Sequence, residues 1–284
     1  MNDVSIIGPG QTEVKEMWGT SIRHLAWYAI EAALDDAHVS SVDALFVGNM
    51  AAGQLSNQMH LGALVADFAG LRGIEAVTVE AADASGGAAL RQAVLAVKSG
   101  LVETALVVGV EKMTDQVGSP VRPFSPAPST PITKRSMTHR GWHGGAADAP
   151  LPARIWPDGG RFCHFSVNAH ANGAANPLAM YRNRLKADRF ASAPPVATPV
   201  TLFDAAPSGD GAAAVIITRH ERAQDMVPQP IRIVGSALAT DTLALHDRKN
   251  MLHLRAAELS AKAMAAAASA TTTLICLSCT IRLP

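Results

Sequence analysis

The sequence predicts a layered α/β fold with mainly parallel strands, and two observations support that prediction. Over the first 117 residues, short runs rich in β-branched residues alternate with longer stretches whose apolar residues recur at helical spacing. Such alternation is typical of crossover units, in which helices cover the faces of a sheet. The chain of 284 residues is 48% hydrophobic and 17% charged, which is enough apolar material for a sizeable core.

The expected elements follow this alternation from the N-terminus. Strands are expected at 4–8, 43–49, 76–82 and 104–111, and helices at 21–37, 58–69 and 85–98. Farther along, the pattern predicts a helix at 177–189, strands at 212–218 and 231–238, and a helix rich in Ala and Leu at 253–270. The chain then divides into an N-terminal α/β half at 1–117, an anomalous proline-rich segment at 118–165, a loop region with a closing strand at 166–218, and the start of a truncated second half at 219–284.

Charge and composition exclude several classes of protein. The 24 basic and 24 acidic residues balance, so no long-range field recruits nucleic acid or an anionic membrane. No apolar run reaches the roughly 18 residues that a membrane-spanning helix needs, and the N-terminus lacks the pattern of a signal peptide. The three cysteines, Cys163, Cys276 and Cys279, form neither a disulfide framework nor a four-ligand zinc set. We therefore expect a cytoplasmic protein without a bound metal.

A site-like turn is expected where the third strand meets the third helix. The segment AVTVEAA runs into Asp83, and ASGGAALRQAVLAV then opens a helix. A side chain at that junction lies beside unpaired backbone N–H groups, which favour a thiolate, a carboxylate or a developing oxyanion. Gly86 and Gly87 would let a substrate or another backbone approach closely. The simpler alternative is that Asp83 only caps the helix, because Asp is a preferred N-cap residue.

The segment VEAADASGGAALRQAVLAVKSG, together with ALVVGVEKMTD downstream, resembles the nucleophile region of thiolases, in particular of sterol-carrier-type and archaeal-type acetyl-CoA acyltransferases. The start VSIIGPGQTEV, the stretch VGNMAAGQLSNQMHLGALVADFAGL and the later FSVNAHANGAANP and SGDGAAAVIIT resemble further parts of the family. The resemblance covers roughly 1–117 and 166–270 and implies a thiolase-like α-β-α fold. It also implies Claisen condensation or thiolysis of coenzyme A thioesters, which are substrates, with no bound cofactor.

The resemblance places Asp83 where the family carries its nucleophilic cysteine. A carboxylate is a far poorer acyl acceptor than a thiolate, so we expect no thiolase turnover, and a residual decarboxylase or hydrolase activity stays open. By the same resemblance, the residues expected to contact substrate or coenzyme A are Ser85, Gly86, Gly87, Asn168, His170 and Asn172. The alternative for the last three is structural, with the asparagines capping turns and the histidine solvated.

The resemblance also implies partners and leaves the functional class open. Thiolases are dimers or tetramers, so a homodimer is expected, and this branch works with other proteins of acyl-CoA metabolism, including a small zinc-ribbon and OB-fold partner. The chain is an acyltransferase by descent, a non-catalytic coenzyme A-binding or scaffold subunit, or a non-functional product.

Four further residues have expected positions. Asp210 in SGDG is expected to make a turn, whereas Lys112, Met113 and Thr114 are expected near the floor of the site.

Two stretches depart from the family and look like DNA read one base out of frame. The letters STPITKRSM at 129–137 can be encoded so that a shifted register gives LDADYEAVH, and TTTLICLSCTIRLP at 271–284 can likewise give DDDLDLFELHDSFT. Both shifted readings resemble thiolase sequences, the second being the E-L-H-D-x-F catalytic loop. All three cysteines would then lie in shifted segments, and the later histidine and second cysteine of the family would be missing from a truncated chain.

Overall fold

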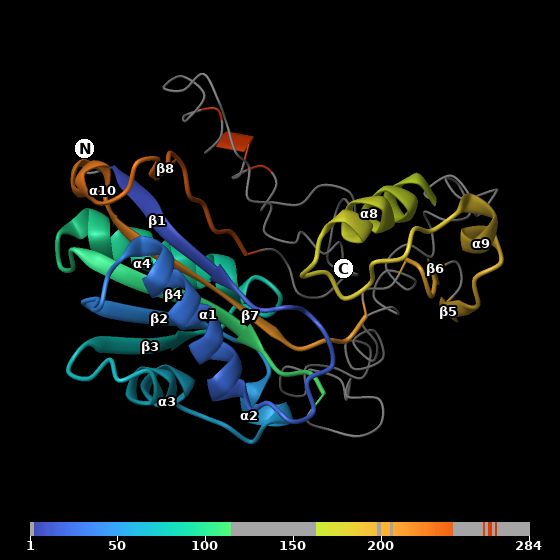
Figure 1. The fold of residues 1–284 in the computed structure, drawn as a ribbon, viewed down its shortest axis with the longest axis horizontal. Coiled ribbons are helices and arrows are strands. Elements are labelled where there is room, and N and C mark those ends of the chain that lie inside the picture. Colours follow the sequence, from blue (N-terminus) through green and yellow to red (C-terminus); the bar gives the residue numbers. More distant parts are fainter. Residues whose placement is uncertain are drawn as a thin grey trace.

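The computed structural model describes residues 3–114, 163–197, 200–204 and 207–240, with isolated helical positions between 258 and 265. Within these residues, the body of the molecule is a six-stranded sheet in the order β3-β2-β4-β7-β1-β8 (Figure 1). The strands are β1 (Val4–Gln11), β2 (Ala44–Gly48), β3 (Glu75–Val79), β4 (Thr104–Glu111), β7 (Gly211–Arg219) and β8 (Ile231–Ile233). The strands expected up to 218 are confirmed, and the one expected at 231–238 is limited to β8.

The sheet is mixed: the four strands of residues 1–117 (β1, β2, β3 and β4) run in one direction, which confirms the mainly parallel arrangement predicted there, and β7 and β8 run in the other. β2 runs parallel to both β3 and β4, but β7 is antiparallel to β4 and to β1, and β8 is antiparallel to β1. The reason lies in the long connection between β4 and β7. β4 ends at Glu111 and β7 starts at Gly211, and these two residues are register partners. The chain therefore re-enters the sheet at the edge where it left, and a strand that enters there must run in the opposite direction.

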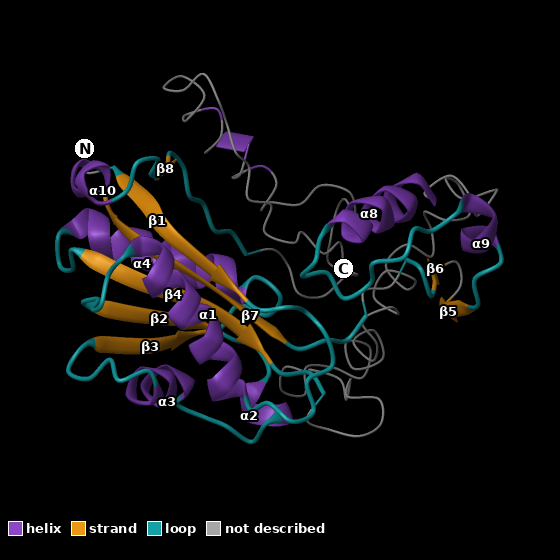
Figure 2. Cartoon of the chain, viewed as in Figure 1, coloured by secondary structure: helices purple, strands orange, loops and turns teal. Residues whose placement is uncertain are grey.

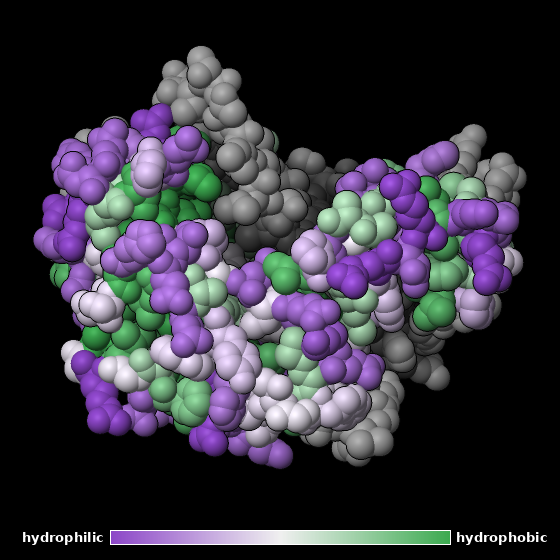
Figure 3. Space-filling view, in the orientation of Figure 1, coloured by the Kyte–Doolittle hydropathy of each residue, from purple (hydrophilic) through white to green (hydrophobic). Residues whose placement is uncertain are grey.

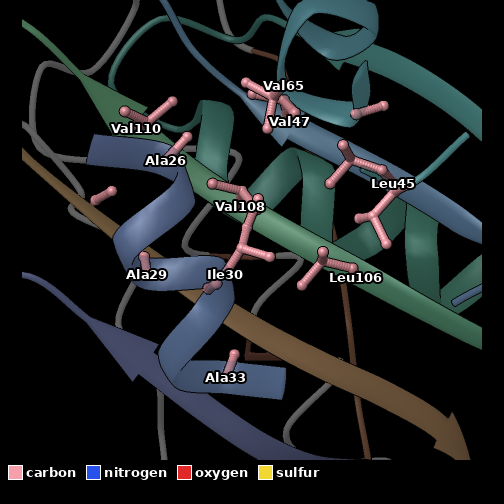
Figure 4. Close-up of a cluster of buried hydrophobic side chains, with 14 of the residues drawn as sticks. Ala26, Ala29, Ile30, Ala33, Leu45, Val47, Val65, Leu106, Val108 and Val110 are labelled. Carbon is pink, nitrogen blue, oxygen red and sulfur yellow. The ribbon is translucent and has the colours of Figure 1, made fainter. Parts of the chain in front are cut away.

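Helices cover both faces of the sheet and make a three-layer α-β-α body (Figure 2). α1 (Ile22–Ala37) and α3 (Leu61–Phe68) pack on one face, and α4 (Ser85–Ser99) packs on the other. Because successive side chains of a strand point to opposite faces, Leu45 and Val47 of β2 join the α1 cluster, whereas Ala44 and Phe46 join the α4 cluster. Figure 4 shows the first cluster, in which α1 lies over β4 and β7 and the side chains of Leu45 and Val47 extend the cluster along the sheet. The predicted layered fold and these three helices are confirmed.

Residues 163–197 and 200–204 form a lobe beside the edge of the sheet where β2 and β4 end (Figure 1). The lobe contains α8 (Cys163–Ala175), α9 (Ala187–Ala191), β5 (Pro195–Ala197) and β6 (Val200–Thr201). Its small core consists of Cys163, Leu185 and Phe190, with Val167 and Phe203 packed against them. Hydrophilic residues cover much of the lobe surface that faces the viewer in Figure 3.

Two predictions for the lobe are wrong. The region expected to begin as a loop at 166 is the helix α8, and the helix expected at 177–189 is reduced to α9. The break lies at Asn176, whose side-chain Oδ1 accepts the Leu178 N–H at 3.0 Å. Pro177 disfavours a helical conformation at the residue before it, and the asparagine side chain offers the backbone a turn instead.

Several predictions fall outside the described residues. They concern nearly all of the proline-rich segment at 118–165, most of the helix expected at 253–270 and the final stretch at 271–284. The two frame-shifted readings, the truncation and the division into four parts therefore stay predictions. Two short helices, α2 (Ala52–Leu55) and α10 (His220–Met226), were not expected from the sequence.

Candidate active site

The turn at Asp83 connects β3 to α4 in a shape that exposes its side chain. Ala82 has a φ of 49°, in the left-handed region that residues other than glycine rarely adopt, which costs about 1–3 kcal/mol. Ser85 holds the turn, because its Oγ donates to the Ala82 carbonyl at 2.6 Å and accepts the Ala81 N–H at 2.9 Å. The N-cap residue of α4 is Ala84, which has no polar side chain. Asp83 therefore does not occupy the N-cap position that was its alternative role.

Glycines set the position of this turn against the sheet. A Cβ on Gly48, at the end of β2, would lie 2.7 Å from the Cα of Gly86 and 2.7 Å from the Ser85 carbonyl oxygen. The first turn of α4 therefore rests directly on the backbone of the sheet. The missing side chain of Gly48 permits this approach, whereas a Cβ on Gly86 would meet nothing within 4 Å. The substrate contacts of Ser85, Gly86 and Gly87 stay predictions.

A polar network lies beside the turn, where the parallel strands end. Asn49 donates through Nδ2 to Glu111 Oε1 and to the Val110 carbonyl, both at 2.9 Å. The Glu111 carboxylate also accepts the backbone N–H groups of Met50 at 3.0 Å and Ala51 at 3.3 Å. Asn49 and Glu111 were not predicted from the sequence, although a polar residue at the carboxyl end of a parallel strand is a signal for a site.

Asp210 does more than make a turn, which corrects the expectation for the SGDG segment. Its carboxylate is fully buried and accepts five hydrogen bonds: from the backbone N–H groups of Met17, Met113 and Thr114, from the Thr114 hydroxyl, and from Lys112 Nζ at 2.8 Å. Burial alone would raise the pKa of this carboxyl. The bonds from Lys112, Thr114 and Met17, together with the charge of Lys112, nevertheless hold the pKa below its ordinary value.

Lys112 is a buried cation whose exposed fraction is only 1%. Besides its ion pair with Asp210, its Nζ donates to Thr114 Oγ1 at 2.8 Å and lies 6.0 Å from the centre of the Trp18 ring. Buried charges are stable only when they are paired and hydrogen-bonded, and this cluster meets both conditions. Lys112, Met113 and Thr114 thus follow β4 into the interior near the carboxyl edge.

The lobe carries a pocket of about 480 Å³ that is rich in basic side chains. His170 lines it from α8, and its Nδ1 lies 3.0 Å from the Asn183 carbonyl oxygen. The other residues of the pocket come from the segment that leads into α9 and from the stretch after β6: Asn183, Arg184, Leu185, Lys186, Asp188, Arg189 and Phe203. Three cations beside one carboxylate favour an anionic ligand.

The two asparagines predicted with His170 do not join it at the pocket. Asn168 and Asn172 stand four residues apart on α8, and both side chains are exposed. Because they lie within a helix, they do not cap turns, and that alternative is wrong. A contact between these asparagines and a ligand stays a prediction. The basic residues of the pocket were missed, since their spacing in YRNRLKADR resembled an ordinary solvated surface.

Neither a metal centre nor a membrane span is found in the part of the chain that the structure describes. No group of three or more His, Cys, Asp or Glu side chains there could hold a metal ion. None of the described helices is long and apolar enough to cross a bilayer. Cys163 is buried and is a free thiol, not part of a disulfide, and the other two cysteines lie outside the described residues.

Solved structures share this architecture. The Ltp2-ChsH2(DUF35) aldolase matches with a TM-score of 0.76 and 18% identity, covering 95% of this chain and 71% of that one. Human mitochondrial 3-ketoacyl-CoA thiolase in complex with CoA matches with a TM-score of 0.62 and 18% identity, covering 79% of this chain and 66% of that one. The body and its turn therefore define a protein of the thiolase-like α/β fold class.

Sequence comparison gives the family. The family model described as thiolase, N-terminal domain, matches residues 4–137. The acetyl-CoA acetyltransferase of Methanothermobacter thermautotrophicus is 36% identical over 262 residues, which cover 90% of this chain and 67% of the relative. That of Methanocaldococcus jannaschii is 37% identical over 277 residues, covering 92% and 68%. The chain belongs to the thiolase family.

Proposed function

We propose that this chain binds coenzyme A thioesters at the Asp83 turn and the lobe pocket but forms no covalent acyl-enzyme. The observation that carries the proposal is a carboxylate on a turn built to expose residue 83 at a helix N-terminus. The family resemblance puts a nucleophilic cysteine at that position. Acyl transfer to Asp83 would give an anhydride, which water hydrolyses readily, whereas transfer to a thiolate gives a thioester that can pass its acyl group on.

The turn favours thioester binding even without a nucleophile. The N–H groups at the start of α4 carry a partial positive charge, which stabilises the oxygen of a polarised thioester. The Asp83 carboxylate adds a negative charge beside that oxygen and opposes enolate formation. The consequence is a turn that holds a thioester and turns it over slowly or not at all.

The lobe pocket supplies the charge that a coenzyme A ligand needs. Coenzyme A carries phosphates, and arginine side chains bind phosphate oxygens with paired N–H donors. Arg184 and Arg189 place two such side chains around one pocket, and Lys186, between them in sequence, adds a third positive charge. His170, whose ring stacks with that of Tyr181 at 6.4 Å, closes one side. We assign phosphate binding to these cations.

The first test compares the chain with its Asp83→Cys variant. After incubation with acetyl-CoA, intact-mass measurement is expected to find no acetylated wild-type protein and a singly acetylated Asp83→Cys protein. Asp83→Ser serves as the matched control, because it removes the charge without adding a thiolate. An acetylated wild-type chain, or thiolysis by it above background, would contradict the proposal.

The second test measures coenzyme A affinity by calorimetry. Arg184→Ala and Arg189→Ala are each expected to weaken binding by about three- to tenfold, since each removes a charge-assisted bond. Arg72→Ala is the control, because that arginine is exposed on the sheet body and forms an exposed ion pair with Asp67. Equal affinities in all three variants would exclude the lobe pocket and leave the question of the turn to the mass measurement.

The proposal includes two assemblies. In the described residues β3 is an edge strand that pairs only with β2, and Val77 on it is 46% exposed, which supports pairing with a second copy. Light scattering should report a dimer, and Val77→Lys should make it a monomer.

The Ltp2-ChsH2(DUF35) neighbour supports a zinc-ribbon and OB-fold partner, testable by co-purification with such a protein. The cytoplasmic location stays a prediction.

A further inference from the structure

One buried carboxylate connects three segments that are far apart in the sequence. Asp210 precedes β7, and it accepts the N–H of Met17 in the loop after β1 at 2.8 Å. It also accepts the N–H groups of Met113 and Thr114, which follow β4, at 2.8 and 3.0 Å. Its own backbone pairs with Lys15, with N–H···O distances of 2.9 and 3.2 Å. All three segments meet at the edge of the sheet that faces the lobe.

The same loop also holds the lobe. The Val14 N–H donates to the Leu178 carbonyl of the lobe at 3.0 Å. The segment around Asp210 leads from the lobe into β7, which is orange in Figure 1. The chain therefore passes between body and lobe at the place where Asp210 is anchored, and the loop that contacts the lobe is tied to the same carboxylate.

The charge of this pair needs an explanation beyond stability. Lys112 and Asp210 are both fully buried, and replacing a buried ion pair by apolar residues of similar volume often leaves a protein equally or more stable. What the pair adds is a fixed orientation, because the hydrogen bonds from five donors to one carboxylate are directional and permit a single arrangement of the three segments. Apolar packing would tolerate several arrangements of the lobe.

We infer that Lys112 and Asp210, supported by Thr114, form a lock that sets the orientation of the lobe relative to the sheet body. They are positioning residues, since the pocket lies in the lobe and the Asp83 turn lies on the body. The inference goes beyond the proposed function and does not rest on it. A lobe held in one orientation is a property of the free chain, with or without a ligand.

Hydrogen exchange measured residue by residue tests the lock without any ligand. The main variant is the double substitution Lys112→Met with Asp210→Asn, which leaves no unpaired buried charge. Its Val14 amide and its lobe amides are expected to exchange about tenfold faster or more, relative to the amides of β2 and β4. Glu103→Gln is the control, because it removes exposed ion pairs to Arg219 and Arg222 at the opposite edge of the sheet.

The outcome separates a lock from ordinary stabilisation. A lock predicts that exchange accelerates at Val14 and in the lobe while the strands keep their protection. If the lobe and the strands accelerate by the same factor, or if the lobe does not change, the inference is wrong. Should the double variant fail to fold, Thr114→Val removes only the hydroxyl bonds to Asp210 and Lys112, and the same ratio must then rise by a smaller factor.

Discussion

The sheet body and the lobe are built on different principles, although the proposed ligand site needs both. In the body, two clusters of buried side chains cover the two faces of one sheet. Strands that helices separate along the chain are hydrogen-bonded to one another in that sheet. Among the described residues of the lobe, the core consists of three buried residues and two partly buried ones. The body can therefore hold a strained turn in place, whereas the lobe depends on its attachment.

This difference assigns separate tasks to the two parts. Groups that face a reacting atom are best held by rigid elements, and the Asp83 turn rests on the ends of β2 and α4. Regions with few buried contacts open at low free energy and are suited to admitting and releasing ligands. The pocket of the lobe lies in such a region. The lock at Asp210 is where the mobile part would be fixed to the rigid part.

The largest expected effects come from shortening one buried side chain in the core of the body and one in the core of the lobe. Leu106→Ala in the body removes a fully buried side chain and should lower the free energy of global unfolding by about 2–5 kcal/mol. Phe190→Ala in the lobe removes a side chain that is 2% exposed, with an expected loss of about 3–5 kcal/mol confined to the lobe. Urea unfolding followed by circular dichroism gives the first value, and hydrogen exchange of the lobe gives the second. A Phe190→Ala variant with a lowered global midpoint would show that body and lobe unfold as one unit.

A smaller effect is expected where the turn meets the sheet. Gly48→Ala places a Cβ 2.7 Å from backbone atoms of α4, and this overpacking should lower the free energy of unfolding by about 1–3 kcal/mol. Gly19→Ala is the matched control, because a Cβ there meets nothing within 4 Å, and its stability should equal or slightly exceed that of the wild type. Thermal unfolding of both variants checks the pair. Equal melting temperatures would mean that α4 shifts freely on the sheet.

The smallest expected effect is on the stability of the protein at low pH. The folded-state pKa of Asp210 lies below its ordinary value of 3.8, so the group stabilises the protein above that pH. This contribution is lost as the pH falls through the folded pKa, where the carboxylate that faces Lys112 becomes protonated. The urea midpoint of the wild type should therefore drop below pH 4 more steeply than that of Asp210→Asn. Identical slopes would remove Asp210 from the acid sensitivity of the joint.

The sequence predicted the body well and the lobe poorly, for physical reasons. In the body, the periodicity of apolar residues reports burial directly, so β2, β4, α1 and α4 appear close to their predicted bounds. In the described part of the lobe, few residues are buried and local turn chemistry decides, so the periodicity did not predict α8, which ends before Asn176 and Pro177, and the helix predicted at 177–189 is reduced to α9. The basic pocket has no periodic signal, because its cations lie in the short stretch 183–189 and only the fold adds His170 and Phe203 to them.

The sequence by itself determined the order and type of the elements in the body, the layered arrangement and the exposed turn with Asp83 where the family resemblance places a cysteine. These features follow from residues close in the chain: alternating burial along a strand, helical spacing, and small residues after a turn. Only the tertiary structure decided the antiparallel entry of β7, the pocket of the lobe and the buried pair of Lys112 and Asp210. Those two partners are 98 residues apart, and no local pattern encodes which distant carboxylate will neutralise a buried lysine.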